Sequence, residues 1–228
     1  MKRIVVAASI LVLAGCAMGP TNVQKLDRLE SVGEDPRIVL MPPDIRYYLL
    51  TAGGVTEPNR EWTEAAQVNF TEAALDYANN IGADLKILDK DNLGPEEIRY
   101  ETLHSAVGMT VLTHYFGTHK LPSKEESFDW SLGPEISAIG ENHNADYALF
   151  VFYRDYQASE GRVAFAILAA AAGVAIHSGS EGGFASLVDL ETGDIVWFNV
   201  VNVGSGELKD KASAAEAVNR LFADIPGR

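Results

Sequence analysis

The spacing of apolar residues predicts a long helix over residues 60–81. Its apolar side chains recur every three or four residues, as on the buried face of an amphipathic helix. They are Trp62, Ala66, Phe70, Ala73, Tyr77 and Ile81. Pro58 and Asn59 introduce the helix, and Gly82 follows it in the way that commonly ends one.

Three further helices follow from weaker patterns. One begins at Pro95 and ends at Gly117, and a short one begins at Pro134. The first has four predicted buried positions, Ile98, Leu103, Val107 and Val111. The spacing of Ser213 and Glu216 is that of a capping box, which predicts a last helix. Its predicted buried residues are Val218, Leu221, Phe222 and Ile225.

Short apolar runs predict the strands. Residues 37–41 form one that stops at Pro42 and Pro43, and residues 85–88 form another. Residues 147–153 are apolar on both faces, which suits a central strand covered on both sides. Residues 184–190 and 195–203 flank a Glu-Thr-Gly-Asp turn and predict a hairpin. Strands and helices together predict a single α/β domain with a mixed β-sheet flanked by helices.

One segment interrupts this plan. Val163 to Ile176 is fourteen residues long, rich in alanine and free of charge, within an apolar insertion at about 158–183. As a helix it would be about 21 Å long, too short to cross a hydrocarbon core of about 30 Å. Three interpretations stay open: a buried or half-buried helix packed on the sheet, an exposed apolar element for self-association or a partner, or membrane insertion.

The start of the chain has the pattern of a lipoprotein signal peptide, predicted over residues 1–15. A basic beginning and a short apolar run lead to Leu-Ala-Gly-Cys, which matches the bacterial lipobox. Cys16 is then the predicted lipid attachment site, and residues 16–35 are a lipidated tether to a periplasmic domain at 36–228. Ala17 and Met18 follow the cysteine where inner-membrane lipoproteins usually carry Asp. This favours the outer membrane, with the domain facing the periplasm.

The net charge and the cysteine content limit the classes of partner and the covalent links that the chain can form. Removing residues 1–15 leaves 213 of the 228 residues and takes two positive charges away, so the net charge changes from −14 to −16. An acidic body does not suit nucleic acid, so the membrane contact is predicted to come from acyl chains on Cys16. Cys16 is the single cysteine, which excludes an internal disulfide.

Catalytic patterns are missing from the sequence. The five histidines, His104, His114, His119, His143 and His177, form no zinc-protease spacing. No nucleophile elbow or phosphate loop is present either. Arg154 and Asp155 are adjacent on a strand, so they face opposite sides and do not act as one site. We therefore expect no enzyme activity, no cofactor and no metal.

Three sequence pieces occur together here: residues 38–43 (IVLMPP), a long helix that runs to Gly82, and residues 145–151 (ADYALFV) leading to 188–197 (VDLETGDIVW). In these pieces the chain resembles the curli-secretion-channel-like group of bacterial lipoproteins, which includes periplasmic activators of peptidoglycan synthases. The resemblance covers about residues 36–225. It implies an α/β domain that binds other proteins or itself without catalysis.

The leading hypothesis is thus a periplasm-facing outer-membrane lipoprotein that acts in envelope assembly, secretion or maintenance through protein contacts, with an envelope protein or with itself. One alternative is a small-ligand binding lipoprotein, with a pocket near Tyr47, Tyr48 and the Gly53-Gly54 loop. The other alternative is a subunit of an oligomeric export pore.

Overall fold

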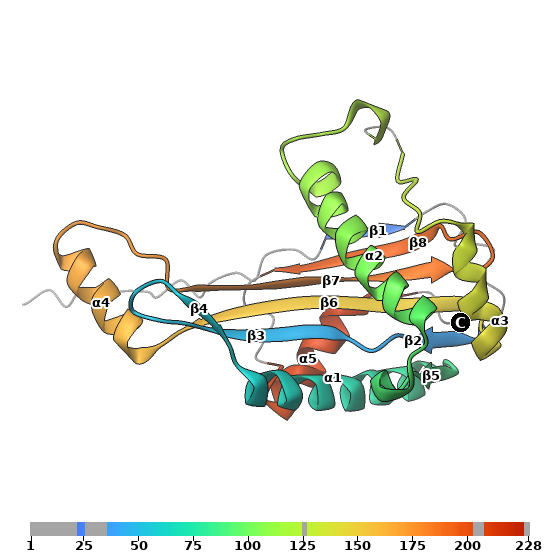
Figure 1. The fold of residues 1–228 in the computed structure, drawn as a ribbon, viewed down its shortest axis with the longest axis horizontal. Helices are drawn as coiled ribbons and strands as arrows, with labels where there is room; N and C mark the ends of the chain where they lie inside the picture. Colours follow the sequence, from blue (N-terminus) through green and yellow to red (C-terminus); the bar gives the residue numbers. More distant parts are fainter. Residues whose placement is uncertain (1–21, 26–35, 125–126, 203–207, 226–228) are drawn as a thin grey trace, which may run out of the picture.

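A computed structural model shows an eight-stranded sheet with helices packed on both faces (Figure 1). It describes residues 22–25, 36–124, 127–202 and 208–225. The strands are β1 (Asn22–Lys25), β2 (Ile38–Leu40), β3 (Asp44–Leu50), β4 (Thr56–Pro58), β5 (Leu85–Ile87), β6 (Tyr147–Ala158), β7 (Gly179–Asp189) and β8 (Ile195–Asn202). Parallel and antiparallel pairs both occur, so the fold is the α/β domain with a mixed sheet that was predicted.

The strand order is β1-β8-β7-β6-β2-β5, and β3 pairs with both β6 and β4. Strand β6 is antiparallel to β7 and parallel to β2 and then β3. Leu40 lies opposite Leu149 and Asp44 opposite Phe152, so residues 41–43 form a bulge against β6. Pro42 and Pro43 therefore interrupt the predicted strand, and pairing resumes in β3, which was not predicted.

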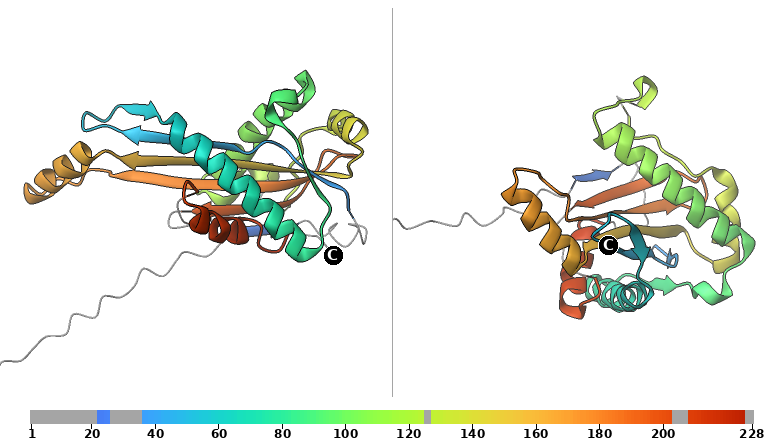
Figure 2. Two further views of the ribbon diagram at one scale, coloured as in Figure 1. Left: turned by 90° about the horizontal axis from the view of Figure 1, so that it is seen from below. Right: turned by 60° about the vertical axis from the view of Figure 1, so that its left-hand side comes forward.

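The longer helices are α1 (Arg60–Ile81), α2 (Pro95–Val111), α3 (Ser137–His143), α4 (Glu160–Ala171) and α5 (Lys211–Leu221). Short helical turns lie at Lys90–Asn92, Leu112–Phe116, Pro122–Lys124 and Pro134–Ile136. Helices α1 and α5 cover one face of the sheet, and α2 and α3 cover the other (Figures 1 and 2). Leu149 and Val151 of β6 point into the first core, whereas Ala148 and Phe150 point into the second. The prediction of a two-faced buried strand is confirmed.

Helix α1 has the caps that the sequence predicts. The Asn59 side chain accepts a hydrogen bond from the Trp62 amide at 3.0 Å, and Gly82 is left-handed with φ 73°. The buried residues are Ala66, Phe70, Ala73, Ala74 and Ala78. The phenyl ring of Phe70 meets that of Phe222, the residue after α5, edge-on, with 5.8 Å between centroids.

Helix α5 begins three residues earlier than the capping-box pattern implies. Asp210 is the N-cap, and its carboxylate accepts a hydrogen bond from the Ser213 amide at 2.9 Å. The capping-box assignment to Ser213 is therefore wrong, because Ser213 already lies in the first turn. The predicted inner face is otherwise present: Val218, Leu221 and Phe222 are buried.

The predicted inner face of α2 is correct at three of its four positions: Val111 is buried, and Leu103 and Val107 pack half-buried against the core. Ile98 is wrong, because it is 53% exposed, and Glu97, Tyr100, His104 and Gly108 are buried as well. The helix approaches the sheet closely at Gly108, where a Cβ would lie 2.0 Å from the ring of Phe184 on β7. His104 and Gly108 lie on the inner side of α2, and the spacing of apolar residues does not predict a histidine or a glycine there.

Strand β1 lies within the segment predicted as a tether. It pairs antiparallel with β8, with Asn22 opposite Val200 and Lys25 opposite Trp197. These four residues are therefore an edge strand of the sheet. Cys16 and the rest of residues 1–35, apart from β1, lie outside the described residues.

Candidate functional site

The strongest candidate surface is the connection between β6 and β7, residues 159–178, which we call the arm. It consists of α4 and the loop after it, and it projects from one end of the sheet (Figures 1 and 2). Ser159 caps α4 by accepting a hydrogen bond from the Arg162 amide at 3.2 Å. At the far end, Gly173 has φ 81°. The amides of Gly173 and Val174 bond to the carbonyls of Ala170 and Ala169 at 2.9 and 2.8 Å.

No residue of α4 is buried. The exposed fractions are 70% for Leu168, 65% for Ile167, 49% for Phe165 and 45% for Val163. At 100° per residue these four side chains spread over an arc of roughly 200°, and alanines occupy much of the rest of the helix. The expectation of a helix packed on the sheet is wrong, and the segment is an exposed apolar element. Among the described residues, no helix is both long and apolar enough to span a bilayer.

The root of the arm is fixed by polar contacts. The Arg162 guanidinium donates from Nε to the His177 carbonyl at 2.8 Å, and the Ser159 amide donates to the Leu50 carbonyl at 2.9 Å. Below the root, the rings of Tyr48 and Tyr156 stack with 4.8 Å between centroids. The apolar helix is thus presented from a defined base on β3, β6 and β7.

A second feature is a groove of about 730 Å³, which we call the β3 groove. It opens where the outer neighbour in the sheet changes from β5 to β4. Its lining includes Pro42, Pro43, Asp44, Arg46, Tyr48, Arg60, Thr63, Gln67, Lys90, Ile98, Glu101, Ser105 and Arg154. Lys90 and Asp44 follow the carboxyl ends of the parallel strands β5 and β2, the usual ligand position in open α/β sheets.

The edge of β3 in this groove is closed to a further strand. The Tyr47 amide donates to Thr63 Oγ1 at 3.0 Å, and the Tyr47 carbonyl accepts from the Asn59 amide at 2.9 Å. The Ile45 carbonyl accepts from Gln67 Nε2 at 3.3 Å. Residues at and near the start of α1 therefore satisfy the backbone groups that an edge strand would otherwise offer to a partner.

Charged side chains converge on Asp44 in the β3 groove. Arg154 Nη2 lies 2.6 Å from Asp44 Oδ2, and Arg46 Nε lies 3.0 Å from Asp44 Oδ1. Burial opposes the charge on Asp44, but the two guanidinium groups outweigh burial and lower its pKa. Burial, followed by the charge of Asp44, raises the pKa of Glu101 to about 7. Near neutral pH, Glu101 is therefore charged in only part of the molecules.

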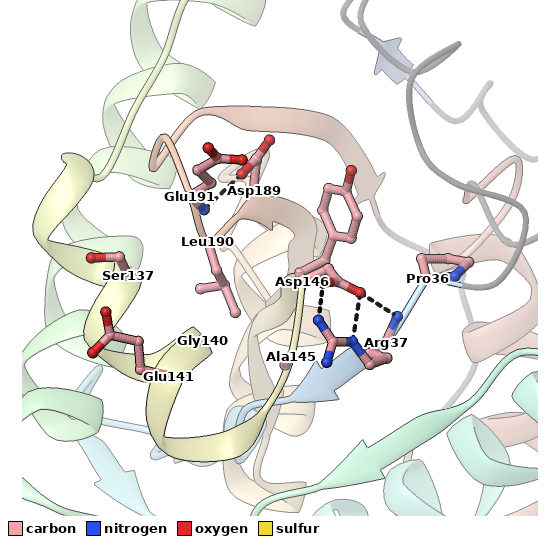
Figure 3. Close-up of a pocket in the computed structure, with 11 residues that line it drawn as sticks. Pro36, Arg37, Ser137, Gly140, Glu141, Ala145, Asp146, Asp189, Leu190 and Glu191 are labelled. Carbon is pink, nitrogen blue, oxygen red and sulfur yellow. Dashed lines mark hydrogen bonds and ion pairs between the residues drawn. The ribbon is translucent and has the colours of Figure 1, made fainter.

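A third feature is a cleft of about 510 Å³ at the opposite end of β6 from the arm (Figure 3). Arg37 crosses it to Asp146: its Nε lies 2.9 Å from Oδ2, and its backbone amide lies 3.0 Å from the same oxygen. This pairing lowers the pKa of Asp146. Glu141, Asp189 and Glu191 also line the cleft. The guanidinium of Arg37, which lines the cleft, is already paired with Asp146 of the same chain.

The structure places the predicted histidines apart. His104 is buried between Phe150 and Phe184, 2.7 Å from Ser186 Oγ, and burial lowers its pKa to about 3. His143 Nε2 lies 2.9 Å from Glu97 Oε1. The ring of His114 contacts the His119 carbonyl. Across the described ranges, no group of three or more His, Cys, Asp or Glu side chains could hold a metal ion.

Arg154 and Asp155 lie on opposite faces of β6, as predicted. Arg154 points to Asp44 in the β3 groove, whereas Asp155 is buried beside Gln157, whose Nε2 lies 3.2 Å from Asp155 Oδ2. Burial raises the pKa of Asp155 to about 6. Tyr47 and Tyr48 line the groove, but Gly53 and Gly54 lie outside its lining.

Sequence reasoning missed Asp44, Arg46 and Glu101, because β3 was not recognised. The signal was present in the alternation over residues 44–48, where Ile45 and Tyr47 are buried and the residues between them are more exposed. An alternation over so few residues is a weak signal for a strand, and the two prolines before it indicate the end of one.

Comparison with known proteins adds little. No family model and no curated protein matches the chain. A PelC dodecamer from Paraburkholderia phytofirmans is similar at 10% identity and a TM-score of 0.41, over 92% of this chain and 99% of that one. A variant of that dodecamer has a TM-score of 0.40 at 10% identity, over 92% and 100%. Scores of this size transfer no property to this chain, and the curli-secretion-channel-like resemblance stays a prediction.

Proposed function

We propose that this chain is an outer-membrane lipoprotein that faces the periplasm and acts without catalysis in envelope assembly, secretion or maintenance. Acyl chains on Cys16 anchor it, and it acts through contacts with an envelope protein or with copies of itself. The uncovered apolar helix α4 is the observation that carries this proposal. Water-exposed apolar surface of this kind is typical of interaction sites.

The surroundings of the one buried histidine–serine pair also support a non-catalytic role. His104 and Ser186 are 2% and 0% exposed, and Phe150 and Phe184 enclose the imidazole ring. Burial keeps His104 neutral at physiological pH. A substrate would have to displace the core of the domain to reach this pair, so we assign it to packing between α2 and the sheet.

Two measurements test the proposal on the full chain in cells. Metabolic labelling with a radioactive fatty acid should label the protein, and Cys16→Ala should remove the label. Chemical crosslinking before detergent extraction should recover an oligomer or a complex with an envelope protein. An unlabelled protein, or a lone monomer at native expression level, contradicts the proposal.

The β3 groove favours a second function, the binding of a small anionic ligand. Four basic residues line it, Arg46, Arg60, Lys90 and Arg154, against two acidic ones, Asp44 and Glu101. This excess stands out in a chain with 18 basic and 32 acidic residues. Arg46 and Arg154 pair with Asp44, and Arg60 pairs with Glu64, so Lys90 is the cation that we assign to the ligand. The lining suits a small molecule that carries a carboxylate or phosphate beside an apolar part.

A thermal-shift screen with anionic envelope metabolites tests this second function, because a ligand raises the melting temperature by mass action. Lys90→Ala should reduce the shift. Lys86→Ala, which changes a lysine outside the groove lining, should leave it unchanged. Equal shifts in both variants would place the ligand elsewhere.

A further inference from the structure

We propose that the arm inserts into the membrane leaflet that holds the acyl chains of Cys16. This inference deepens the proposed function and rests on its lipid anchor. The exposed apolar surface of α4 then supports the membrane location in the proposed function, because its contact is lipid. Contacts with envelope proteins belong to the body of the domain. Three observations carry the inference. They are the end of the sheet at which the chain enters it, the lack of charge over residues 163–176, and the position of the charged residues at the root of the arm.

The chain enters the sheet from the end where the arm projects. Strand β1 is antiparallel to β8, with Asn22 opposite Val200. Strand β8 runs toward Asn202, which lies opposite Gly182 at the start of β7. The first residue of β1 therefore faces the end of the sheet that carries the arm. The Arg37 cleft lies at the opposite end, beside Tyr147.

The lengths agree with a shared membrane surface. Val200 pairs with Phe184, and five residues along β7 separate Phe184 from Gly179 at the root of the arm. That distance is about 16 Å at 3.3 Å per residue. The six residues from Asn22 back to Cys16 extend to at most about 20 Å. An anchor on Cys16 can therefore hold the bilayer surface level with the root of the arm.

The apolar surface of α4 suits lipid better than a single protein neighbour. Val163, Phe165, Ile167 and Leu168 spread over roughly 200° of the helix circumference at 100° per residue, and all four are exposed. One packed helix would cover one side and leave the others in water, whereas hydrocarbon covers every side. The twelve residues of α4 measure about 18 Å. This is close to half of a hydrocarbon core of about 30 Å.

The ends of helix α4 and the charges of the arm are compatible with this environment. Ser159 caps the first turn, and the amides of Gly173 and Val174 bond back to α4, so these backbone groups have partners inside the segment. Glu160, Arg162 and His177 lie at the root, where polar headgroups would meet the protein. Between them, residues 163–176 carry no charge.

The net charge of the chain also indicates how the protein contacts the membrane. With a net charge of −16 once residues 1–15 are removed, the body is repelled by anionic headgroups, so attraction by charge does not bring it to a membrane. Apolar insertion needs no such attraction. The arm should therefore enter vesicles of the zwitterionic lipid phosphatidylcholine.

A fluorescent label on the arm tests the inference in the acylated, full-length protein. Ile167→Cys offers the thiol to an environment-sensitive dye, while acylation occupies Cys16. In phosphatidylcholine vesicles the dye should emit at shorter wavelength and be quenched by lipids brominated on their acyl chains. Val68→Cys is the matched control, because Val68 is 57% exposed on α1, and its dye should report water.

The possible outcomes separate the two proposals. A dye at position 167 that reports water in vesicles overturns the insertion. A dye that is shielded but not quenched by brominated lipid also overturns it and assigns the arm to a protein contact, such as a second copy. Mass spectrometry of the same sample shows whether Cys16 carries lipid, and a free thiol there defeats the proposed function itself.

Discussion

Helices α1 and α4 are both rich in alanine and both end beside a left-handed glycine, yet only α1 packs on the sheet. In α1, Ala66, Phe70 and Ala74 are fully buried, and charged residues occupy the opposite side. In α4 nothing is buried, although it is the more apolar of the two. Apolar content alone therefore does not decide burial in this molecule: α1 lies against the sheet and α5, whereas α4 projects past the end of the sheet.

The largest contrast should come from removing one phenyl ring from each helix. Phe70 is fully buried against Phe222, so Phe70→Ala should lower the free energy of unfolding by about 3–5 kcal/mol. Phe165 is 49% exposed on α4, and Phe165→Ala should change it by less than about 0.5 kcal/mol. Urea unfolding of both variants measures this. A large loss for Phe165→Ala would show that the arm packs on the body in solution.

A second contrast concerns glycine in a covered helix and in the arm. At Gly108 a Cβ would lie 2.0 Å from the fully buried Phe184 ring, so Gly108→Ala should cost about 1–3 kcal/mol by overpacking. At Gly173 a Cβ has no neighbour within 4 Å, and the cost of Gly173→Ala comes from φ 81°, at about 1 kcal/mol. Phe184→Leu makes room for the added methyl group, so it should restore part of the stability lost in Gly108→Ala. It should restore none of the stability lost in Gly173→Ala. Thermal unfolding of the single and double variants measures both effects.

The same contrast explains what the sequence predicts well. Helix α1 has a period, a cap and a terminal glycine that agree with one another, and the structure confirms all three. In α2, His104 and Gly108 occupy the inner face because the sheet supplies Ser186 and a close Phe184, and neither partner is visible from local spacing. In α4 the local spacing does not say whether any side packs, because that depends on its position past the end of the sheet.

The β3 groove was largely beyond local reasoning for a similar reason. Asp44, Glu101 and Arg154 come from β3, α2 and β6, and only the pairing of β3 with β6 brings Asp44 to Arg154. The prolines before β3 suggested the end of a strand, whereas they form a bulge within a longer pairing. Such contacts depend on strand register across more than a hundred residues of sequence.

A third contrast uses pH, because the body holds partly buried carboxyl groups while residues 163–176 carry no charge. Burial and the charge of Asp44 raise the pKa of Glu101 from 4.5 to about 7. The folded state therefore holds this proton more tightly than the unfolded chain, and the resulting stability is lost as the pH rises from about 4.5 through 7. With solvent screening, Glu101→Gln should stabilise the domain at pH 8 by about 1 kcal/mol.

Unfolding at several pH values checks this prediction. Asp155, whose pKa is raised from 3.8 to about 6, contributes a similar slope at lower pH. Glu101→Gln should therefore flatten the curve between about pH 4.5 and 7, and above pH 6 this change is separate from the contribution of Asp155. Asp155→Asn provides the complementary control. A variant that is no more stable than the wild type at pH 8 would mean that Glu101 reaches water freely.

The smallest effect on stability should come from substitutions of exposed residues, which change what the surface contacts and leave the core intact. Ile167 and Leu168 are 65% and 70% exposed, so Ile167→Asp with Leu168→Asp should change the free energy of unfolding by less than about 0.5 kcal/mol each. Val68→Asp on the outer side of α1 should be equally mild. For this test the dye is attached through Phe165→Cys, because position 167 is changed. Only the arm variant should release the lipid-dependent shielding of the dye, because Val68 projects from a helix whose apolar face is already covered. If both variants behave alike, then α4 and the outer side of α1 are equivalent surfaces, and the distinction between a covered helix and an uncovered one has no functional meaning in this protein.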